Sequence, residues 1–375
     1  MTKFLRSGAI NAALLLLPFL LLEGAFRLLP VAYLPEIRPV TAQTPMAHFE
    51  PNVDYRFSRD WNFTFVTHKH SNNYGFIQAS DFHPEERTPL LALIGDSLVE
   101  ANQVDAGKSV GDLLHASLHG EGRVYGLAIS GASLSQYLAY AELAHKTFRA
   151  DALAIVIAPN DFDESLLKYK SEPRFHYFTD EGALQRIDYE LSGTKKVLRR
   201  SAVLRYIMQN LEAGQRLTAL RLSLRGELPS TLTGEALERR LADSYRVVDY
   251  FFEQLAAKTG LGPESIVFVI DPMRRAIYSP EAWAKAQDTY YGRMPRYFAA
   301  QAAARGYEVV DLRPAFVRSN ERGGTIEVAP TDSHWSAIGH QVVAAELAKS
   351  AVFRRTFSGR SDFRSVATHQ AKAKP

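Results

Sequence analysis

Residues 90–98, LLALIGDSL, decide the fold, because a short apolar run ends directly on a Gly-Asp-Ser turn. Comparable apolar runs recur at 124–128, 152–158, 266–270 and 308–312. Runs this short, with no polar residue at every second position, are typical of strands that are buried on both faces. We therefore expect five buried strands from residue 90 onward.

Helical patterns separate these runs, around residues 109–119, 134–148, 236–257 and 281–304. In the third of these segments the apolar residues recur at steps of three and four and mark one helix face: Leu237, Leu241, Tyr245, Val248, Phe252 and Leu255. Buried strands that alternate with helices form a parallel sheet covered on both faces. The predicted fold class is α/β.

The composition fits a folded protein of 375 residues, with 46% hydrophobic and 23% charged residues. The absence of cysteine excludes disulfides, thiolate metal sites and a cysteine nucleophile. We expect no cofactor, because the chain has neither a phosphate-binding glycine loop nor a dinucleotide fingerprint. We also expect no metal site, since His68, His70 and His83 lack a supporting acidic cluster.

Basic residues concentrate in two stretches, although the net charge is only +3. Residues 195–225 contain eight Lys and Arg against the single Glu212, and residues 351–375 contain six against Asp362. We interpret both stretches as mainly solvated charge, with an anionic polymer or lipid headgroups as the alternative partner. Because the basic aromatic signatures of nucleic-acid modules are missing, we expect no nucleic-acid partner.

Residues 8–22 carry no charge and follow Lys3 and Arg6. A helix that continues to about residue 30 roughly spans a bilayer. No small-x-small cleavage site follows, so residues 1–35 are predicted to be an uncleaved signal anchor, with the rest of the chain extracytoplasmic (periplasmic). A cleaved signal peptide and a buried amino-terminal helix of a cytosolic protein are the alternatives.

The remaining chain divides by composition. Residues 36–89 are rich in proline and aromatic residues and are predicted to form an extension packed on the α/β domain of residues 90–350. Residues 163–235 interrupt the alternation and are predicted to form a cap inserted beside the sheet, with a helix that carries Leu204, Ile207, Met208 and Leu211. Residues 351–375 are predicted to be a basic tail.

Chemically useful residues follow the predicted strands. Ser97, Gly131 and Asn160 come just after three of the runs, and the last run leads through a loop to Asp332 and His334. Ligand sites of open α/β sheets lie at the carboxyl ends of the strands, so we expect these residues at one edge. A hydroxyl, a backbone donor, an amide, an imidazole and a carboxylate are the groups needed for acyl transfer at a serine.

Each group has an expected role. His334 would remove the proton of Ser97 as it attacks, and Asp332 would orient the imidazole and stabilise its charged form. The backbone N–H groups of Ser97 and Gly131, with the Asn160 amide, would form an oxyanion hole. Four neighbouring residues are not expected to react. Asp96 and Asp161 are expected to brace loops, and His340 to be packed or surface-exposed. Trp335 is expected to shield the imidazole, to line the acyl pocket or to pack in the core.

These blocks resemble those of the SGNH subgroup of GDSL hydrolases. In that family a GDS serine, a glycine, an asparagine and a histidine occur in the order found here as Ser97, Gly131, Asn160 and His334. The resemblance covers about residues 90–350 and implies a flavodoxin-like three-layer α/β/α sandwich with Ser-His-Asp chemistry on esters. The segment NYGF at 73–76, after the predicted anchor, is similar to membrane-anchored bacterial members.

Several positions depart from the family pattern. Asp332 lies two residues before His334, where the common spacing is three, Gly126 replaces a common asparagine and Ala158 replaces a common glycine. The Asp-x-His-Trp sequence at 332–335 is similar to that of alginate-type SGNH-like O-acetyltransferases, in which it precedes the serine block. The absence of G-x-S-x-G around Ser97 argues against an α/β-hydrolase elbow.

Three functional hypotheses follow from the sequence. The first is an extracytoplasmic serine esterase that removes O-acyl groups, most simply O-acetyl, from a carbohydrate or cell-envelope glycan through an acyl-serine. The second is an O-acetyltransferase that uses the same residues to move acetyl groups onto an exopolysaccharide. The third is an inactive scaffold that binds an anionic polymer or a membrane partner, such as a membrane acetyltransferase.

Overall fold

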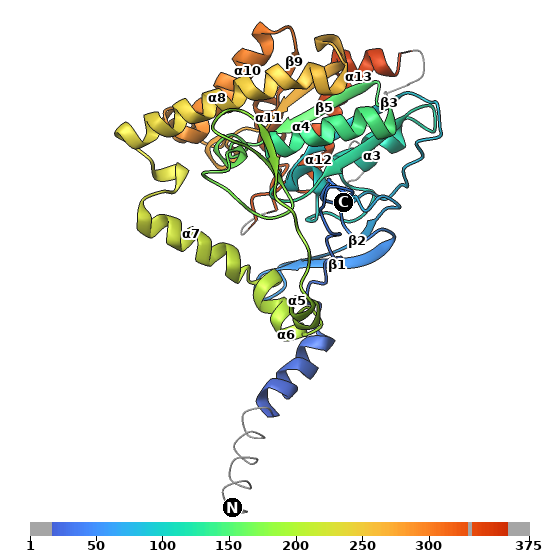
Figure 1. Ribbon diagram of the computed structural model, residues 1–375, viewed down its shortest axis with the longest axis vertical. Coiled ribbons are helices and arrows are strands. Elements are labelled where there is room, and N and C mark those ends of the chain that lie inside the picture. The colour runs from blue at the N-terminus through green and yellow to red at the C-terminus, as the bar shows by residue number, and fades with distance from the viewer. Residues whose placement is uncertain (1–16, 329–331, 359–375) are drawn as a thin grey trace, which may run out of the picture.

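Five parallel strands form the central sheet of this computed structural model, which describes residues 17–328 and 332–358. The strand order is β4-β3-β5-β8-β9, and helices lie on both faces, so the fold is a three-layer α/β/α sandwich (Figure 1). Side chains alternate along β3 between two hydrophobic cores, one on each face of the sheet. Leu90, Ala92 and Ile94 enter the larger one, the main core, whereas Leu91 and Leu93 enter the second core. The α/β prediction is confirmed.

The strands are β1 (Val53–Arg59), β2 (Phe65–Ser71), β3 (Leu90–Gly95), β4 (Arg123–Ala128), β5 (Ala152–Ile157), β6 (His176–Phe178), β7 (Leu184–Arg186), β8 (Ile266–Ile270) and β9 (Glu308–Asp311). The α-helices are α2 (Ser97–Glu100), α3 (Val110–Ser117), α4 (Leu134–Leu143), α5 (Gly193–Leu198), α6 (Ala202–Arg205), α7 (Ala213–Arg225), α8 (Gly234–Thr259), α9 (Pro280–Ala286), α10 (Tyr290–Ala304), α11 (Arg313–Glu321), α12 (Ala337–Ala348) and α13 (Ala351–Thr356). A further helix covers residues 17–28.

The five strands expected from the sequence are the five strands of this sheet, with ends that differ by at most one residue. The helix expected over 281–304 is two helices, α9 and α10. They are separated at residues 287–289, and Gly292 in the first turn of α10 approaches α9 closely. A Cβ on Gly292 would lie 2.1 Å from the Ala286 carbonyl oxygen, so this junction requires glycine.

The extension before residue 90 packs on the sheet domain. β1 and β2 pair as an antiparallel hairpin, and Phe76 and Phe82 enter the main core. The Gln78 side chain donates to the Val124 carbonyl and accepts from the Gly126 amide, at 2.8 and 2.7 Å, along the outer edge of β4. Gln78 thus occupies the place of a neighbouring strand, and a Cβ on Gly126 would lie only 3.3 Å from its Oε1.

The stretch 163–235 separates into two parts. Its first part, which includes the β6–β7 hairpin, packs against the main core through Phe175, Tyr177 and Phe178. Its helical part lies away from the sheet: α5 and α6 are next to the helix of residues 17–28, and α7 extends from them toward α8 (Figure 1). Of the four apolar residues expected on one helix face at 204–211, Ile207 and Met208 are exposed, and Leu204 and Leu211 are half-buried.

The structure describes only part of the two chain ends. In the part of the chain that the structure describes, no helix is both long enough and apolar enough to cross a membrane. Residues 1–16 of the predicted anchor and residues 359–375 of the predicted tail lie outside the described residues. The folded domain continues past residue 350, because α13 buries Val352 and Phe353 in the second core, together with the following Phe357.

Candidate active site

Ser97 lies at the carboxyl end of β3, where the chain turns into α2. Asp96 precedes this short helix, and its Oδ1 accepts the Leu98 amide at 2.9 Å. A Cβ on Gly95 would lie 2.5 Å from Val99 Cγ2, so the tight turn requires glycine at this position. The Gly-Asp-Ser block therefore presents the Ser97 hydroxyl at the edge of the sheet, 2.8 Å from His334 Nε2.

The other ring nitrogen of His334 contacts a buried carboxylate. His334 Nδ1 lies 2.5 Å from Asp332 Oδ1, and the His334 amide donates to the same oxygen at 2.8 Å. The Asp332 side chain is 1% exposed and that of His334 is 24% exposed. Burial alone would raise the pKa of Asp332, but hydrogen bonds from His334 and the charge of Arg59 lower this pKa to about 2. The spacing of two residues therefore permits the carboxylate to contact and orient the ring.

Arg59 and Gln103 also contact Asp332, and the sequence analysis did not identify either residue. Arg59 Nε lies 3.4 Å from Asp332 Oδ2, and Gln103 Nε2 donates to the same oxygen at 3.3 Å. Arg59 also pairs with Glu212, which precedes α7. Arg59 ends strand β1 of the extension, so no local motif connects it to the Asp332 block in the sequence.

A second set of contacts fixes the loop that carries His334. Arg274 Nε donates to the Ser333 carbonyl at 2.8 Å, and Trp335 Nε1 donates to Asp271 Oδ1 at 2.9 Å. Trp335 is fully buried in the second core, so core packing is the correct interpretation of this residue. His340 packs edge-on against the Trp335 ring at 5.5 Å, and burial lowers the pKa of His340 to about 3.

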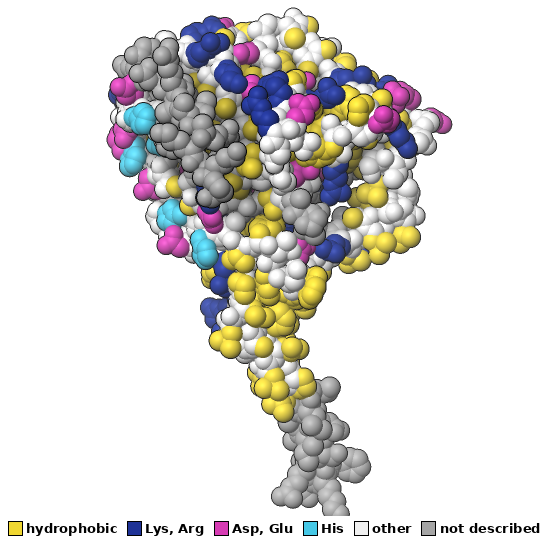
Figure 2. Space-filling view, turned by 180° about the vertical axis from the view of Figure 1, so that it is seen from behind, with side chains coloured by type: hydrophobic (Ala, Val, Ile, Leu, Met, Phe, Trp, Pro, Cys, Tyr) yellow, Lys and Arg dark blue, Asp and Glu magenta, His cyan; other side chains and the backbone are white. Residues whose placement is uncertain are grey.

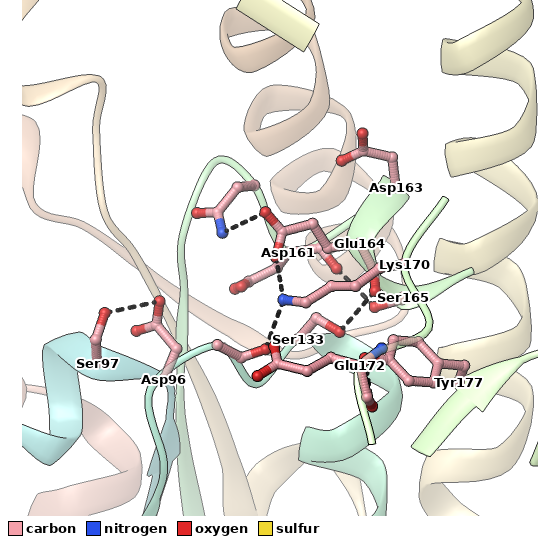
Figure 3. Close-up of polar contacts among 12 residues, drawn as sticks. Asp96, Ser97, Ser133, Asp161, Asp163, Glu164, Ser165, Lys170, Glu172 and Tyr177 are labelled. Atoms are coloured by element: carbon pink, nitrogen blue, oxygen red, sulfur yellow. Dashed lines mark hydrogen bonds and ion pairs between the residues drawn. The ribbon is translucent and has the colours of Figure 1, made fainter. Parts of the chain in front are cut away.

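Gly131 and Asn160 follow β4 and β5, the two strands that flank β3 in the sheet. Gly131 has a φ of +87°, a conformation that favours glycine. Asn160 Nδ2 donates to Glu164 Oε1 at 3.2 Å, and Lys170 Nζ donates to the Gly131 carbonyl at 2.8 Å and pairs with Glu164 at 2.5 Å (Figure 3). An amide group has two N–H bonds, so Asn160 keeps a second donor for a substrate oxygen.

Asp96 and Asp161 brace the loops around Ser97. Asp161 accepts the Ala158 amide at 2.7 Å and the Tyr137 hydroxyl at 3.0 Å, and burial together with the charge of Asp96 raises its pKa well above the usual range. Asp96 Oδ2 lies 3.5 Å from the Ser97 hydroxyl (Figure 3), a longer contact than the one from His334. His334 is therefore the better placed group to accept the Ser97 proton.

The histidines considered as metal ligands have other contacts. His70 Nδ1 lies 2.7 Å from Asp54 Oδ1, and His83 Nδ1 lies 3.2 Å from Glu85 Oε1. Within residues 17–328 and 332–358, no group of three or more His, Asp or Glu side chains is arranged to hold a metal ion.

Comparison with known proteins gives one family match. Residues 230–375 match the model of a family described as "SGNH hydrolase-like domain, acetyltransferase AlgX". This region contains Asp332 and His334, whereas Ser97, Gly131 and Asn160 precede it. No curated protein sequence matches the chain.

Several solved structures are similar to this chain at low identity. An alpha/beta hydrolase enzyme from the metagenome of Lake Arreo, Spain, is 17% identical, with 71% of this chain and 95% of that chain covered and a TM-score of 0.40. A member of the lipolytic protein G-D-S-L family from Veillonella parvula is 12% identical (69% and 96% covered, TM-score 0.37). The acetyl xylan esterase AlAXEase is 14% identical (69% and 97% covered, TM-score 0.37).

Proposed function

We propose that the chain is an SGNH-type serine enzyme that forms an acyl-serine at Ser97, and the match of residues 230–375 to an SGNH hydrolase-like family model supports this proposal. The observation that carries the proposal is the continuous contact from the Ser97 hydroxyl through both ring nitrogens of His334 to Asp332. A serine hydroxyl is a weak nucleophile unless a base removes its proton, and His334 Nε2 is within hydrogen-bond distance of that proton.

The proposed reaction has two halves. Ser97 Oγ attacks the ester carbonyl carbon while its proton moves to His334 Nε2, and the tetrahedral oxyanion is stabilised by Gly131 N–H, Ser97 N–H and the free Asn160 donor. His334 then protonates the leaving alcohol, and the C–O bond to it breaks. In the second half His334 removes a proton from the incoming water or alcohol, whose oxygen attacks the acyl carbon. The bond from this carbon to Ser97 Oγ then breaks as His334 returns the proton to Oγ. Asp332 remains ionised throughout and stabilises the imidazolium.

Hydrolysis of an O-acetyl ester on a carbohydrate or cell-envelope glycan is the proposed overall reaction. The His334 side chain is 24% exposed, which supports access of water to the base that must activate it. The proposed acceptor is therefore water, and the proposed products are acetate and the deacylated glycan.

An O-acetyltransferase is the second candidate function, because the matched family model is that of an acetyltransferase and includes the Asp332 and His334 block. The first half of the reaction is the same, and a sugar hydroxyl replaces water in the second half. A binding scaffold without activity is less well supported, since such a scaffold has no need of a serine, an imidazole and a carboxylate in contact.

The proposed location is the outer side of a cytoplasmic membrane, with the amino-terminal segment as the anchor. The uncharged run at 8–22 and the preceding Lys3 and Arg6 support this orientation. Association with a membrane acetyltransferase is part of the transferase alternative.

Turnover of p-nitrophenyl acetate and release of acetate from an acetylated oligosaccharide test the proposal on the full chain in detergent. Ser97→Ala should abolish both activities. Ser133→Ala, the same change in the loop between β4 and α4, should retain them. Equal rates in the Ser97→Ala variant and the parent would contradict the proposal. An added sugar acceptor that becomes acetylated at the expense of acetate release would favour the transferase.

A further inference from the structure

Exposed large hydrophobic side chains are concentrated in one part of the molecule. Among the described residues, all but Tyr278 and Ile338 lie in three segments: residues 17–33, Trp61 at the tip of the β1–β2 hairpin, and residues 197–224. Figure 2 shows hydrophobic side chains gathered at the narrow lower end of the molecule. Contiguous exposed apolar surface of this kind marks a place of association.

Specific contacts join residues 17–33 and Trp61 to the part of the third segment that contains α6 and Tyr206. Glu23 accepts the Ala202 amide at 2.9 Å and the Ser201 hydroxyl at 2.8 Å, so it caps the amino end of α6. The Tyr206 ring lies 4.5 Å from that of Phe26, and its hydroxyl donates to the Trp61 carbonyl at 2.8 Å. We refer to residues 17–33, Trp61 and residues 193–225 as the foot.

Helix α7 presents an apolar stripe to solvent. Leu217, Leu220 and Leu224 recur at steps of three and four residues, and their exposed fractions are 48%, 55% and 79%. Leu222, on the opposite side of the helix, is half-buried, and no residue of α7 is buried. By the 3.6-residue periodicity, Arg216 and Arg221 flank the stripe on its two sides.

The foot is also strongly basic. Residues 195–225 contain eight Lys and Arg, and their single acidic residue, Glu212, is paired with Arg59. Lys195, Lys196 and Arg200 are exposed beside the apolar Val197 and Leu198. Lys196 also pairs with Glu36 at 3.4 Å, so the surface combines an excess of positive charge with exposed leucine side chains.

This combination favours a lipid surface over a soluble polyanion. A polyanion would pair with the arginines but would leave the leucine stripe and the 73% exposed Trp61 in water. At an anionic lipid surface the leucines enter the acyl boundary, the arginine side chains reach the headgroups and tryptophan occupies the interface. The helix of residues 17–28 contacts α6 directly, so its exposed leucines and the basic residues of the third segment belong to the same end of the molecule.

We propose that the foot is a peripheral membrane-binding surface that docks on anionic lipid headgroups, with α7 lying in the interface. This surface is additional to the proposed amino-terminal anchor and is independent of the chemistry at Ser97. Each arginine near an anionic surface contributes about fivefold in affinity, so removal of three should weaken docking about a hundredfold.

Quenching of Trp61 by brominated acyl chains tests the proposal on the full chain reconstituted in vesicles. Vesicles of phosphatidylcholine alone are compared with vesicles that also contain phosphatidylglycerol, and the signal of the Trp61→Phe variant is subtracted. We expect Trp61 quenching that requires phosphatidylglycerol and is lost in the triple variant Arg216→Gln, Arg221→Gln, Arg225→Gln. The matched control removes three exposed arginines from the α/β body, Arg239→Gln, Arg318→Gln and Arg322→Gln, and should behave as the parent.

Two outcomes would overturn the proposal. One is the absence of Trp61-specific quenching in both kinds of vesicle. If dextran sulfate, a soluble polyanion, nevertheless binds the parent and does not bind the triple variant, the foot is a polyanion-binding surface instead. The other is quenching of equal strength with and without phosphatidylglycerol and unchanged in the triple variant. Turnover of p-nitrophenyl acetate in detergent should be the same in the triple variant and the parent, which separates failure of this proposal from failure of the proposed enzyme activity.

Discussion

Asp332→Asn should lower kcat by about 10⁴, because both carboxylate oxygens of Asp332 already face hydrogen-bond donors. Oδ1 lies 2.5 Å from His334 Nδ1 and accepts the His334 amide, while Oδ2 faces Gln103 Nε2 and Arg59 Nε. An asparagine has one amide nitrogen and must turn it toward one of these sets. If the amide N–H of the asparagine points toward His334, Nδ1 must accept it and the ring proton moves to Nε2. Nε2 can then no longer accept the proton of Ser97. Turned toward Arg59 instead, the amide sets donor against donor.

The expected size of the effect corresponds to about 5.5 kcal/mol of lost transition-state stabilisation. It contains two contributions: the wrong tautomer of His334 and the loss of the negative charge that stabilises the imidazolium. Neither contribution changes how the ester is bound, so kcat should fall while KM stays nearly constant.

Steady-state kinetics with p-nitrophenyl acetate measures this effect, and circular dichroism confirms that the variant is folded. Asp105→Asn is a suitable control, because Asp105 pairs with Lys108 on the surface. A folded Asp332→Asn variant with kcat within about tenfold of the parent would refute the assigned role of Asp332.

Three further predictions follow from the same contacts. Asn160→Ala should lower kcat by about 10²- to 10³-fold through the loss of one oxyanion donor, and unchanged turnover would remove Asn160 from the site. Arg59→Gln should lower kcat about tenfold with little change in KM, because Arg59 contacts Asp332. Arg56 is on the same strand but donates to backbone carbonyls, so Arg56→Gln should leave kcat unchanged. Equal kcat values in the two variants would contradict a positioning role for Arg59. Because the pKa of Asp332 is lowered to about 2, its contribution of about 2 kcal/mol to the free energy of unfolding should be present above pH 4 and lost as the pH falls through 2. Urea unfolding at several pH values should therefore show the stability difference between the parent and Asp332→Asn shrinking in acid, and a constant difference would contradict the lowered pKa.

The sheet could be predicted from the sequence because its strands are buried on both faces and read as continuous apolar runs. Leu90–Gly95 and Ile266–Ile270 are fully buried strands, and no polar residue interrupts them. The placement of 204–211 could not be predicted in the same way. An apolar helix face shows that something covers the face, but not whether that is the sheet, a helix or a lipid surface, and Ile207 and Met208 remain exposed in this structure.

The candidate site shows the same division. Ser97 and His334 carry local signals, since each lies in a recognisable block after a strand. Arg59 carries none, because its contact with Asp332 arises only when the β1–β2 hairpin packs beside the loop at 332–335. Such a long-range contact depends on tertiary packing, which no periodicity or motif in a single sequence encodes.

Mass spectrometry of the protein during turnover can detect an acyl-serine at Ser97. The full chain is mixed with p-nitrophenyl acetate, quenched in acid and digested. We expect one added acetyl group on the peptide that contains Ser97, which accumulates in the parent and is absent in Ser97→Ala. An acetyl group on another residue, or turnover in Ser97→Ala at the rate of the parent, would contradict this expectation.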